Sequence, residues 1–174
     1  MTTSLYKQTV PVFIHYLKNL SHLLKKGAQF CEEKEGMTAA SMLSFRLVED
    51  MRGLPFQVQS CSNTVKSTIQ RLGNHEVPVI EDTETTFEEL QARIERTIEI
   101  LETAKPEAVD AFGDKEVIME TKMGNFRFAT GQEYVSNYAI PNFHFHLTSA
   151  YCIMRHLGVP LGAFDYLKDV FHKV

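Results

Sequence analysis

The sequence lacks the features that mark several large classes of protein. Its three cysteines are an odd number at wide spacings and form no CxxC pair, which excludes a disulfide framework and a cysteine zinc site. No apolar run reaches membrane-spanning length, and the first ten residues are not those of a signal peptide. We therefore expect a soluble, cytoplasmic protein with no membrane partner.

Basic charge is also scarce. The chain has 18 Lys and Arg against 22 Asp and Glu, so its formal net charge is -4, and no nucleic-acid partner is expected. The motifs GxSxG, GxGxxG and HExxH and the P-loop are all missing, so none of the sites that they build is predicted.

Apolar residues recur at steps of three and four in four long segments. This spacing is typical of amphipathic helices, and the length and composition are those of one globular domain over residues 1–174. The sequence predicts an all-α fold, an antiparallel four-helix bundle. The four long helices are expected at residues 5–33, 54–72, 87–103 and 132–157.

Shorter elements are predicted from local signals. Thr38 is a candidate N-cap for a short helix over residues 39–49. Thr86 and Glu89 have the spacing of a capping box at the start of the third long helix. A last short helix, residues 164–171, is expected to pack its apolar side on the bundle.

Two further signals concern the chain between the third and fourth long helices. The turn residues 123–125 lie between segments 115–119 and 126–129, which together fit a small β-hairpin. Pro141 falls within the fourth helix and should kink it or divide it in two.

The most informative stretch is PNFHFH, residues 141–146. Two residues on a helix are about 200° apart, so His144 and His146 cannot share a face or chelate one metal together. Asn142 and His146 are four apart and do share a face. Arg46 and Asp50 are also four apart, so they can pair with each other or line the mouth of a pocket.

Residues 142–165 resemble the last main helix of DinB/YfiT-like proteins. That helix carries two histidines four apart, then an Arg nine residues on, a Gly-Val soon after and a later Asp. In this sequence His146, Arg155, Gly158-Val159 and Asp165 match that pattern in register.

The whole chain resembles one branch of that superfamily more closely, and the function of this branch is unknown. The stretches that carry this resemblance are Arg46-Leu47, Asp50-Met51, 56–59, 87–90, 92–94, 141–151 and 158–167. The superfamily resemblance implies a four-helix bundle that binds a divalent metal, often nickel or zinc. Three histidines from the second helix and the last main helix hold this metal, and some members are thiol-dependent transferases or isomerases.

The metal site implied by the resemblance is degenerate in this chain. His146 matches one histidine ligand, but Asn142 takes the place of the second, and the third falls near Gln57. Amide oxygens are poor ligands for such metals, and catalytic zinc normally needs three good protein ligands. We therefore predict neither a metal nor another cofactor.

A polar cluster of Gln57, Asn142 and His146 remains inside an apolar bundle. Buried polar groups need partners, and a structural network between the second and last helices would supply them. The other hypothesis is a pocket for a small molecule, with His146 as catalytic acid and base and with Gln57, Asn142, Arg46 and Asp50 binding the substrate.

Three functions stay open on these residues. One is a metal-independent enzyme, an isomerase, dehydratase or cyclase, that uses His146 for proton transfer. The second is a protein without catalysis that binds a ligand or associates with itself as a homodimer. The third, a metal-dependent enzyme of the thiol transferase kind, is disfavoured by Asn142 and Gln57. Whether the protein is an enzyme at all is left open.

Overall fold

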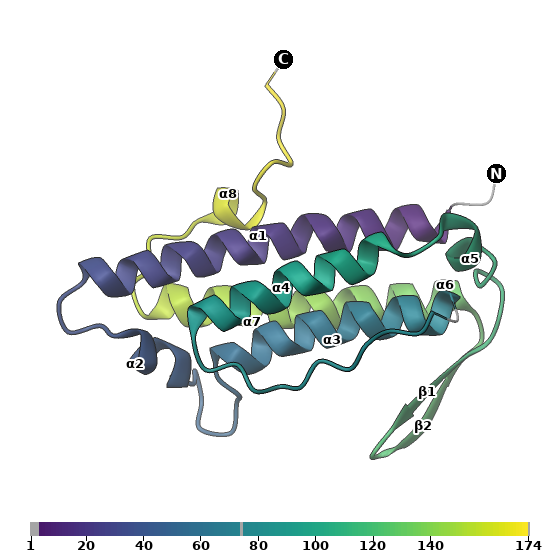
Figure 1. Cartoon of the computed structure of the whole chain (residues 1–174), viewed down its shortest axis with the longest axis horizontal. Coiled ribbons are helices and arrows are strands. Elements are labelled where there is room, and N and C mark those ends of the chain that lie inside the picture. Colours follow the sequence, from purple (N-terminus) through teal and green to yellow (C-terminus); the bar gives the residue numbers. More distant parts are fainter. Residues whose placement is uncertain (1–3, 74, 174) are drawn as a thin grey trace.

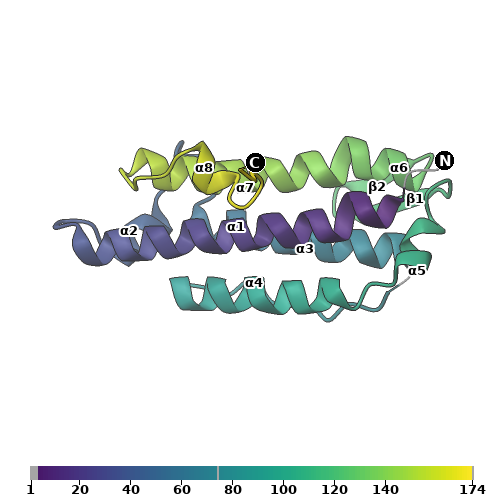
Figure 2. The ribbon, with the colours of Figure 1, turned by 90° about the horizontal axis from the view of Figure 1, so that it is seen from above.

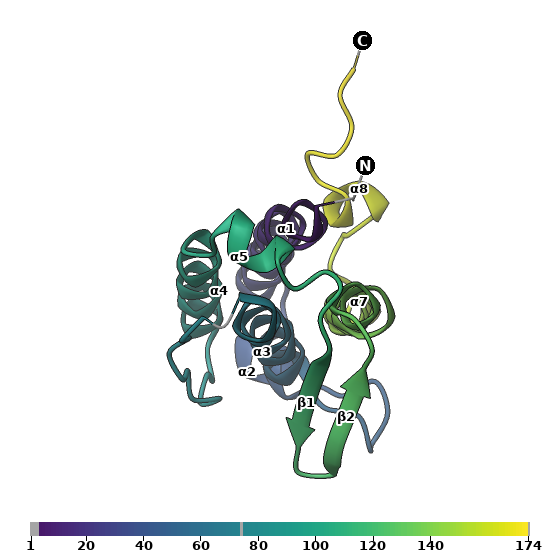
Figure 3. The ribbon, with the colours of Figure 1, turned by 90° about the vertical axis from the view of Figure 1, so that its right-hand side faces the viewer.

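The chain folds around four long helices, as predicted. The structure is a computed structural model that describes residues 4–73 and 75–173. The helices are α1 (Leu5–Glu33), α3 (Leu54–Gly73), α4 (Phe87–Glu102) and α7 (Ile140–His156), and they lie along one another (Figure 1). In the view along the bundle, α4 and α7 lie on opposite sides of the pair α1 and α3 (Figure 3).

The core lies where the apolar stripes of these helices meet. Burial of one such aliphatic or aromatic side chain contributes roughly 1.5–3 kcal/mol to the free energy of unfolding, relative to leaving it exposed. Phe13 of α1 and Phe143 of α7 are both fully buried, with ring centroids 5.2 Å apart. No helix within the described ranges is long and apolar enough to cross a membrane.

The direction of one helix differs from the antiparallel expectation. The segment 75–86 runs back along α3, so that α3 and α4 point the same way (Figure 1). Two side chains of α3 hold this segment: Gln59 donates to Glu84 at 2.9 Å, and Asn63 donates to both oxygens of Asp82 at 3.1 and 3.2 Å. A return segment of this length removes the need for neighbouring helices to alternate in direction.

Arg93 of α4 fixes the return segment from the inside. Its side chain has no exposed surface and forms ion pairs with Asp82 at 2.7 Å and Glu84 at 2.8 Å. It also donates to the Asn63 side chain at 2.8 Å. Burial works to raise the pKa of Glu84, but hydrogen bonds from Arg93 and Gln59 outweigh it and hold that pKa below its ordinary value.

The first short helix, α2 (Ala39–Ser44), is shorter than the predicted span of 39–49. Thr38 caps it as expected, in a capping box with Ser41. The helix ends because Phe45 takes an extended conformation, with φ -66° and ψ 143°. The residues from there to Leu54 form an irregular loop.

The predicted last helix is also shorter, and only part of its apolar surface packs on the bundle, through Tyr166. It is α8 (Ala163–Tyr166). Phe164 and Phe171 are 79% and 62% exposed, and their rings contact each other with centroids 5.5 Å apart. Two contacts hold α8 to α1: the Tyr166 ring lies 6.1 Å from that of Tyr16, and Asp165 accepts from Lys26 at 2.8 Å.

The predicted hairpin is present. β1 (Val117–Thr121) pairs antiparallel with β2 (Gly124–Phe128), and the register joins Val117 to Phe128 and Thr121 to Gly124. The turn therefore begins slightly earlier than residues 123–125. In the views of Figures 1 and 3 the hairpin stands beside α3 and α7 and projects away from the bundle.

The last long helix is not divided in two at Pro141: it stays helical and changes to π geometry just before this residue. Its path consists of α6 (Gly131–Tyr134), a π-helical segment η1 (Val135–Ala139) and then α7. The Ile140 N–H donates to the Val135 carbonyl, five residues back. Pro141 lacks an N–H and is tolerated in the first turn of α7, where that donor is not needed. A further short helix, α5 (Pro106–Asp110), precedes the hairpin.

Seen from above, α1 lies in the middle, with α7 and α8 on one side of it and α4 on the other side (Figure 2). The interface between α3 and α7 lies on the same side of the bundle as the hairpin (Figure 3). The candidate site lies at this interface.

Candidate functional site

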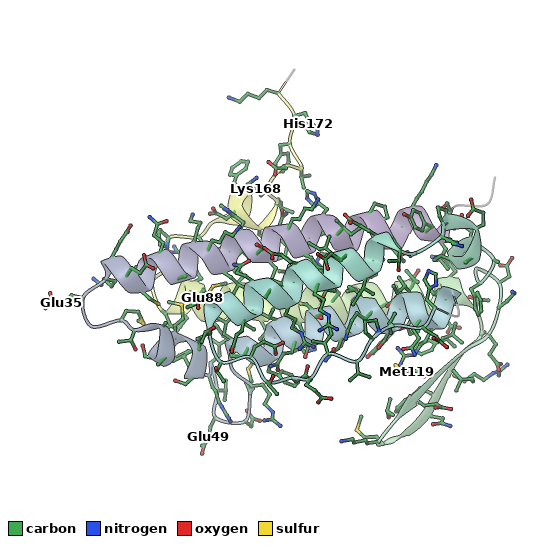
Figure 4. The ribbon with its side chains drawn as sticks, in the orientation of Figure 1. Glu35, Glu49, Glu88, Met119, Lys168 and His172 are labelled. Atoms are coloured by element: carbon green, nitrogen blue, oxygen red, sulfur yellow. The ribbon has the colours of Figure 1, made fainter. Side chains whose placement is uncertain are left out.

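A partly open cavity of about 300 Å³ lies between α3 and α7. Thr64, Ser67 and Arg71 of α3 line one wall, and Asn142 and His146 of α7 line the opposite wall. Met119 of β1 covers part of it, and Figure 4 shows this side chain between the hairpin and α3. Hydroxyl, amide, guanidinium and imidazole groups therefore surround the space.

His146 is held by Gln57. The imidazole Nδ1 lies 2.8 Å from Gln57 Oε1, and the other end of that amide donates to the Arg52 carbonyl at 2.9 Å. The amide oxygen can only accept, so Nδ1 of a neutral ring carries the proton. Nε2 is then the unprotonated nitrogen, and it has no hydrogen-bond partner among the described residues.

Asn142 faces the same cavity but has a different partner. Its Nδ2 donates to the Thr64 hydroxyl at 2.7 Å. Gln57 is buried behind His146 and is not part of the cavity lining. The structure thus brings the predicted cluster to one interface, as a direct pair of His146 with Gln57 and a separate pair of Asn142 with Thr64.

His144 points away from this cavity, as the helical phase predicted. Its Nδ1 lies 3.0 Å from the Tyr166 hydroxyl, and its ring packs edge-on against Tyr16 with centroids 4.7 Å apart. It therefore belongs to the contact of α7 with α1 and α8. The two histidines have no partner in common.

Burial sets the charge state of both histidines. It lowers the pKa of His146 and that of His144 below the ordinary value of 6.5, because the charged ring loses solvation. Both rings are neutral at pH 7. His146 is therefore ready to accept a proton at Nε2.

Arg46 and Asp50 do not reach this cavity. Both are exposed on the loop after α2, and Arg46 donates to the Glu49 carbonyl at 3.3 Å. Figure 4 shows Glu49 on the outer side of this loop. The helix ends at Ser44, so the spacing of four no longer brings the two side chains together, and no ion pair joins them in the described structure.

The residues at the three ligand positions do not fit a metal. Among the described residues no three His, Cys, Asp or Glu side chains gather where they could hold one. Gln57 Oε1 is already bonded to His146, and Asn142 offers only an amide. Soft divalent metals prefer imidazole and thiolate to such amide oxygens. The residues at these three positions are therefore not suited to hold such a metal.

Arg71, Thr64 and Tyr138 are cavity residues that sequence reasoning missed. A signal for them exists in the spacing. Thr64 and Arg71 follow Gln57 at intervals of seven on α3, which keeps them near one face. Tyr138 precedes Asn142 by four. The contribution of the hairpin to the cavity has no such local signal.

A larger hollow of about 530 Å³ lies elsewhere, between the end of α1, α2 and the start of α4. Within the described residues its lining contains Cys31, Glu32 and Glu88 but no histidine. Burial raises the pKa of the Cys31 thiol, which keeps it protonated and unreactive. The chemistry therefore favours the smaller cavity as the site.

Comparison with known proteins gives a family and a structural relative. A family model described as a domain of unknown function, DUF1993, matches residues 5–167. A crystal structure of a DinB family member protein from Shewanella denitrificans is similar at 34% identity, with a TM-score of 0.88. The similarity covers 98% of this chain and 95% of the other. No curated protein matches the chain.

Proposed function

Since the chain belongs to DUF1993, a DinB-like family of unknown function, we propose its function from the cavity itself. The protein binds a small organic molecule between α3 and α7, and His146 exchanges a proton with it. The observation that carries this proposal is the 2.8 Å contact of His146 Nδ1 with Gln57 Oε1. It holds Nδ1 protonated and leaves Nε2 as the acceptor for a ligand.

The chemistry follows from that tautomer. A neutral imidazole can take a proton from one atom of a substrate at Nε2 and return it to another atom. Isomerisation, dehydration and cyclisation need this transfer without a change of oxidation state. The reaction that we propose is therefore of this metal-independent kind.

The size and lining of the cavity restrict the ligand. Ligand pockets are commonly about 300–1,000 Å³, so this cavity suits a small molecule. Its wall offers the hydroxyls of Ser60, Thr64 and Ser67 as well as the Asn142 amide. The edge-on ring of Phe56, 5.9 Å from the His146 ring, adds an apolar contact at one end. A small polar molecule with one apolar part fits this surface best.

Thermal shifts with a metabolite library test the proposal. The variants are His146→Gln and, as a matched control, His144→Gln, because His144 is a half-buried histidine on the same helix that faces the other way. A ligand at one hundred times its Kd stabilises by about 2.7 kcal/mol. At about 2–4 °C per kcal/mol, the melting temperature should rise by roughly 5–11 °C.

We expect at least one compound to stabilise the wild type and His144→Gln but not His146→Gln. A library without any stabilising compound, or compounds that stabilise His146→Gln equally, would contradict the proposal. A compound that binds without being converted would support the alternative of a ligand-binding protein without catalysis.

A further inference from the structure

Arg71 lies at the end of the cavity opposite His146. It is one turn beyond Ser67 on α3, and its Nη1 donates to the Tyr134 hydroxyl at 3.0 Å. The guanidinium carbon also lies 5.7 Å from the centre of the Tyr134 ring. The aromatic ring and its hydroxyl therefore hold the guanidinium against the cavity wall.

Arg71 has no ion-pair partner in the part of the chain that the structure describes. In residues 4–73 and 75–173, no carboxylate forms an ion pair with it. Asp82 is an acidic residue of the cavity lining, but Arg93 pairs with it at 2.7 Å and Asn63 donates to it at 3.1 Å. Among the described residues, no ion pair therefore offsets the positive charge of Arg71 at its end of the cavity.

The donors of Arg71 are largely unused as well. A guanidinium has five N–H groups in a planar fork. Within the described residues, Tyr134 is the one hydrogen-bond acceptor of this side chain. The other four N–H groups have no acceptor among the described residues, and the planar fork matches the geometry of a carboxylate or a phosphate.

We propose that Arg71 binds an anionic end group of the ligand, a carboxylate or a phosphate. This inference rests on the function proposed above, because it takes the same cavity as the binding site. Ser67 and Tyr138 line the same part of the cavity, and their hydroxyls can donate to the remaining oxygens of the anion. The uncharged part of the ligand then extends towards His146.

The distance between the two ends limits the shape of this ligand. Along α3, His146 lies beside its hydrogen-bond partner Gln57. The Tyr134 hydroxyl, which accepts from Arg71, lies 3.5 Å from the Thr68 hydroxyl further along the same helix. These positions on α3 are about 16 Å apart along the helix axis, at 1.5 Å per residue. A ligand that contacts both His146 and Arg71 is therefore extended rather than compact.

Titration calorimetry with matched probes tests the inference. The probes are linear carboxylic acids of increasing length, their primary amides and the alkyl phosphates of the same chain lengths. The variants are Arg71→Gln and Arg71→Lys, with Arg96→Gln as control, because Arg96 is an exposed arginine on α4. Circular dichroism and melting curves establish that each variant is folded.

We expect the wild type and Arg96→Gln to bind an anionic probe about tenfold to one hundredfold more tightly than its amide. Arg71→Gln should lose this preference, and Arg71→Lys should keep part of it, because lysine retains the charge without the fork. The relative affinities of acids and phosphates identify the anion.

The role of Arg71 is overturned if amides bind the wild type as well as the acids do, or if Arg71→Gln retains the preference. The proposed function survives either result when His146→Gln still weakens binding of the same probes. If neither acids nor phosphates bind the wild type, Arg71 has no such role. The metabolite screen then decides separately whether the cavity binds a neutral molecule.

Discussion

The Nδ1 atom of His146 lies 2.8 Å from Oε1 of Gln57, and this contact joins the middle of α7 to the first turns of α3. The amide cannot turn freely, because its nitrogen donates to the Arg52 carbonyl at 2.9 Å. Gln57 therefore determines which nitrogen of His146 carries the proton.

Changing the acceptor should change the pKa of His146. In Gln57→Glu the carboxylate favours the charged imidazole, so the pKa, which burial lowers, should rise. NMR titration of the histidine ring protons measures this directly, with His144 as an internal reference that stays at its own value. A His146 pKa that is the same in Gln57→Glu and the wild type would show that the two side chains are not in contact.

Removing the acceptor should instead reduce stability. Gln57→Leu leaves Nδ1 of His146 buried without a partner, which costs about 1–3 kcal/mol. For a chain of this size the melting temperature should fall by about 2–4 °C per kcal/mol. Loss of less than about 1 °C in a thermal melt would mean that the imidazole finds another acceptor.

Asn142→Ala should be milder. The Thr64 hydroxyl already donates to the Ser60 carbonyl at 2.7 Å, so removal of the Asn142 amide leaves only an acceptor without a partner. We expect a cost of about 0.5–1.5 kcal/mol, with weaker ligand binding as the larger effect. If Asn142→Ala and His146→Ala both destabilise strongly and no small molecule stabilises the wild type, the polar contacts are structural only.

Stability should depend on pH below about 6.5, the ordinary pKa of histidine. The pKa values of His144 and His146 are lowered in the folded chain, so the unfolded chain takes up protons first as the pH falls. The free energy of unfolding should therefore decrease from about pH 6.5 towards the folded pKa values, and above pH 6.5 this contribution should be constant. Urea unfolding at several pH values measures it, and His146→Gln should reduce the slope. A stability that rises as the pH falls through this range would contradict the direction of these shifts.

The return segment 75–86 should depend on Arg93. Arg93→Met leaves Glu84 with its buried partner missing, and breaking a buried pair costs about 3–5 kcal/mol. Arg96→Gln on the exposed side of α4 should change the free energy of unfolding by no more than about 0.5 kcal/mol. Hydrogen exchange should locate the loss of protection in the return segment, and equal protection in both variants would refute the anchoring role.

Local signals predicted most of the helical architecture. The caps at Thr38 and Thr86 and the opposite directions of His144 and His146 all follow from spacing within one helix. These features depend on contacts between residues close in sequence, which is why the chain itself reveals them.

The features that could not be predicted depend on contacts between distant segments. The parallel course of α3 and α4 results from the bonds of the return segment to Arg93 and Asn63. Arg46 and Asp50 are predicted near the site if the short helix continues to residue 49. In the structure α2 ends at Ser44. Nothing in the hairpin sequence indicates which helices it lies beside. The spacing of seven between Thr64 and Arg71 indicates a shared helix face, but only the position of α7 shows that this face lines a cavity.

A crystal structure with a stabilising compound from the screen tests the central claim most directly. We predict that the compound lies between α3 and α7, with a polar atom at hydrogen-bond distance, about 2.6–3.2 Å, from Nε2 of His146. The contact of Nδ1 with Gln57 should be unchanged in the complex. A compound bound in the hollow between α1, α2 and α4, or an imidazole whose Nε2 has no contact with it, would contradict the account.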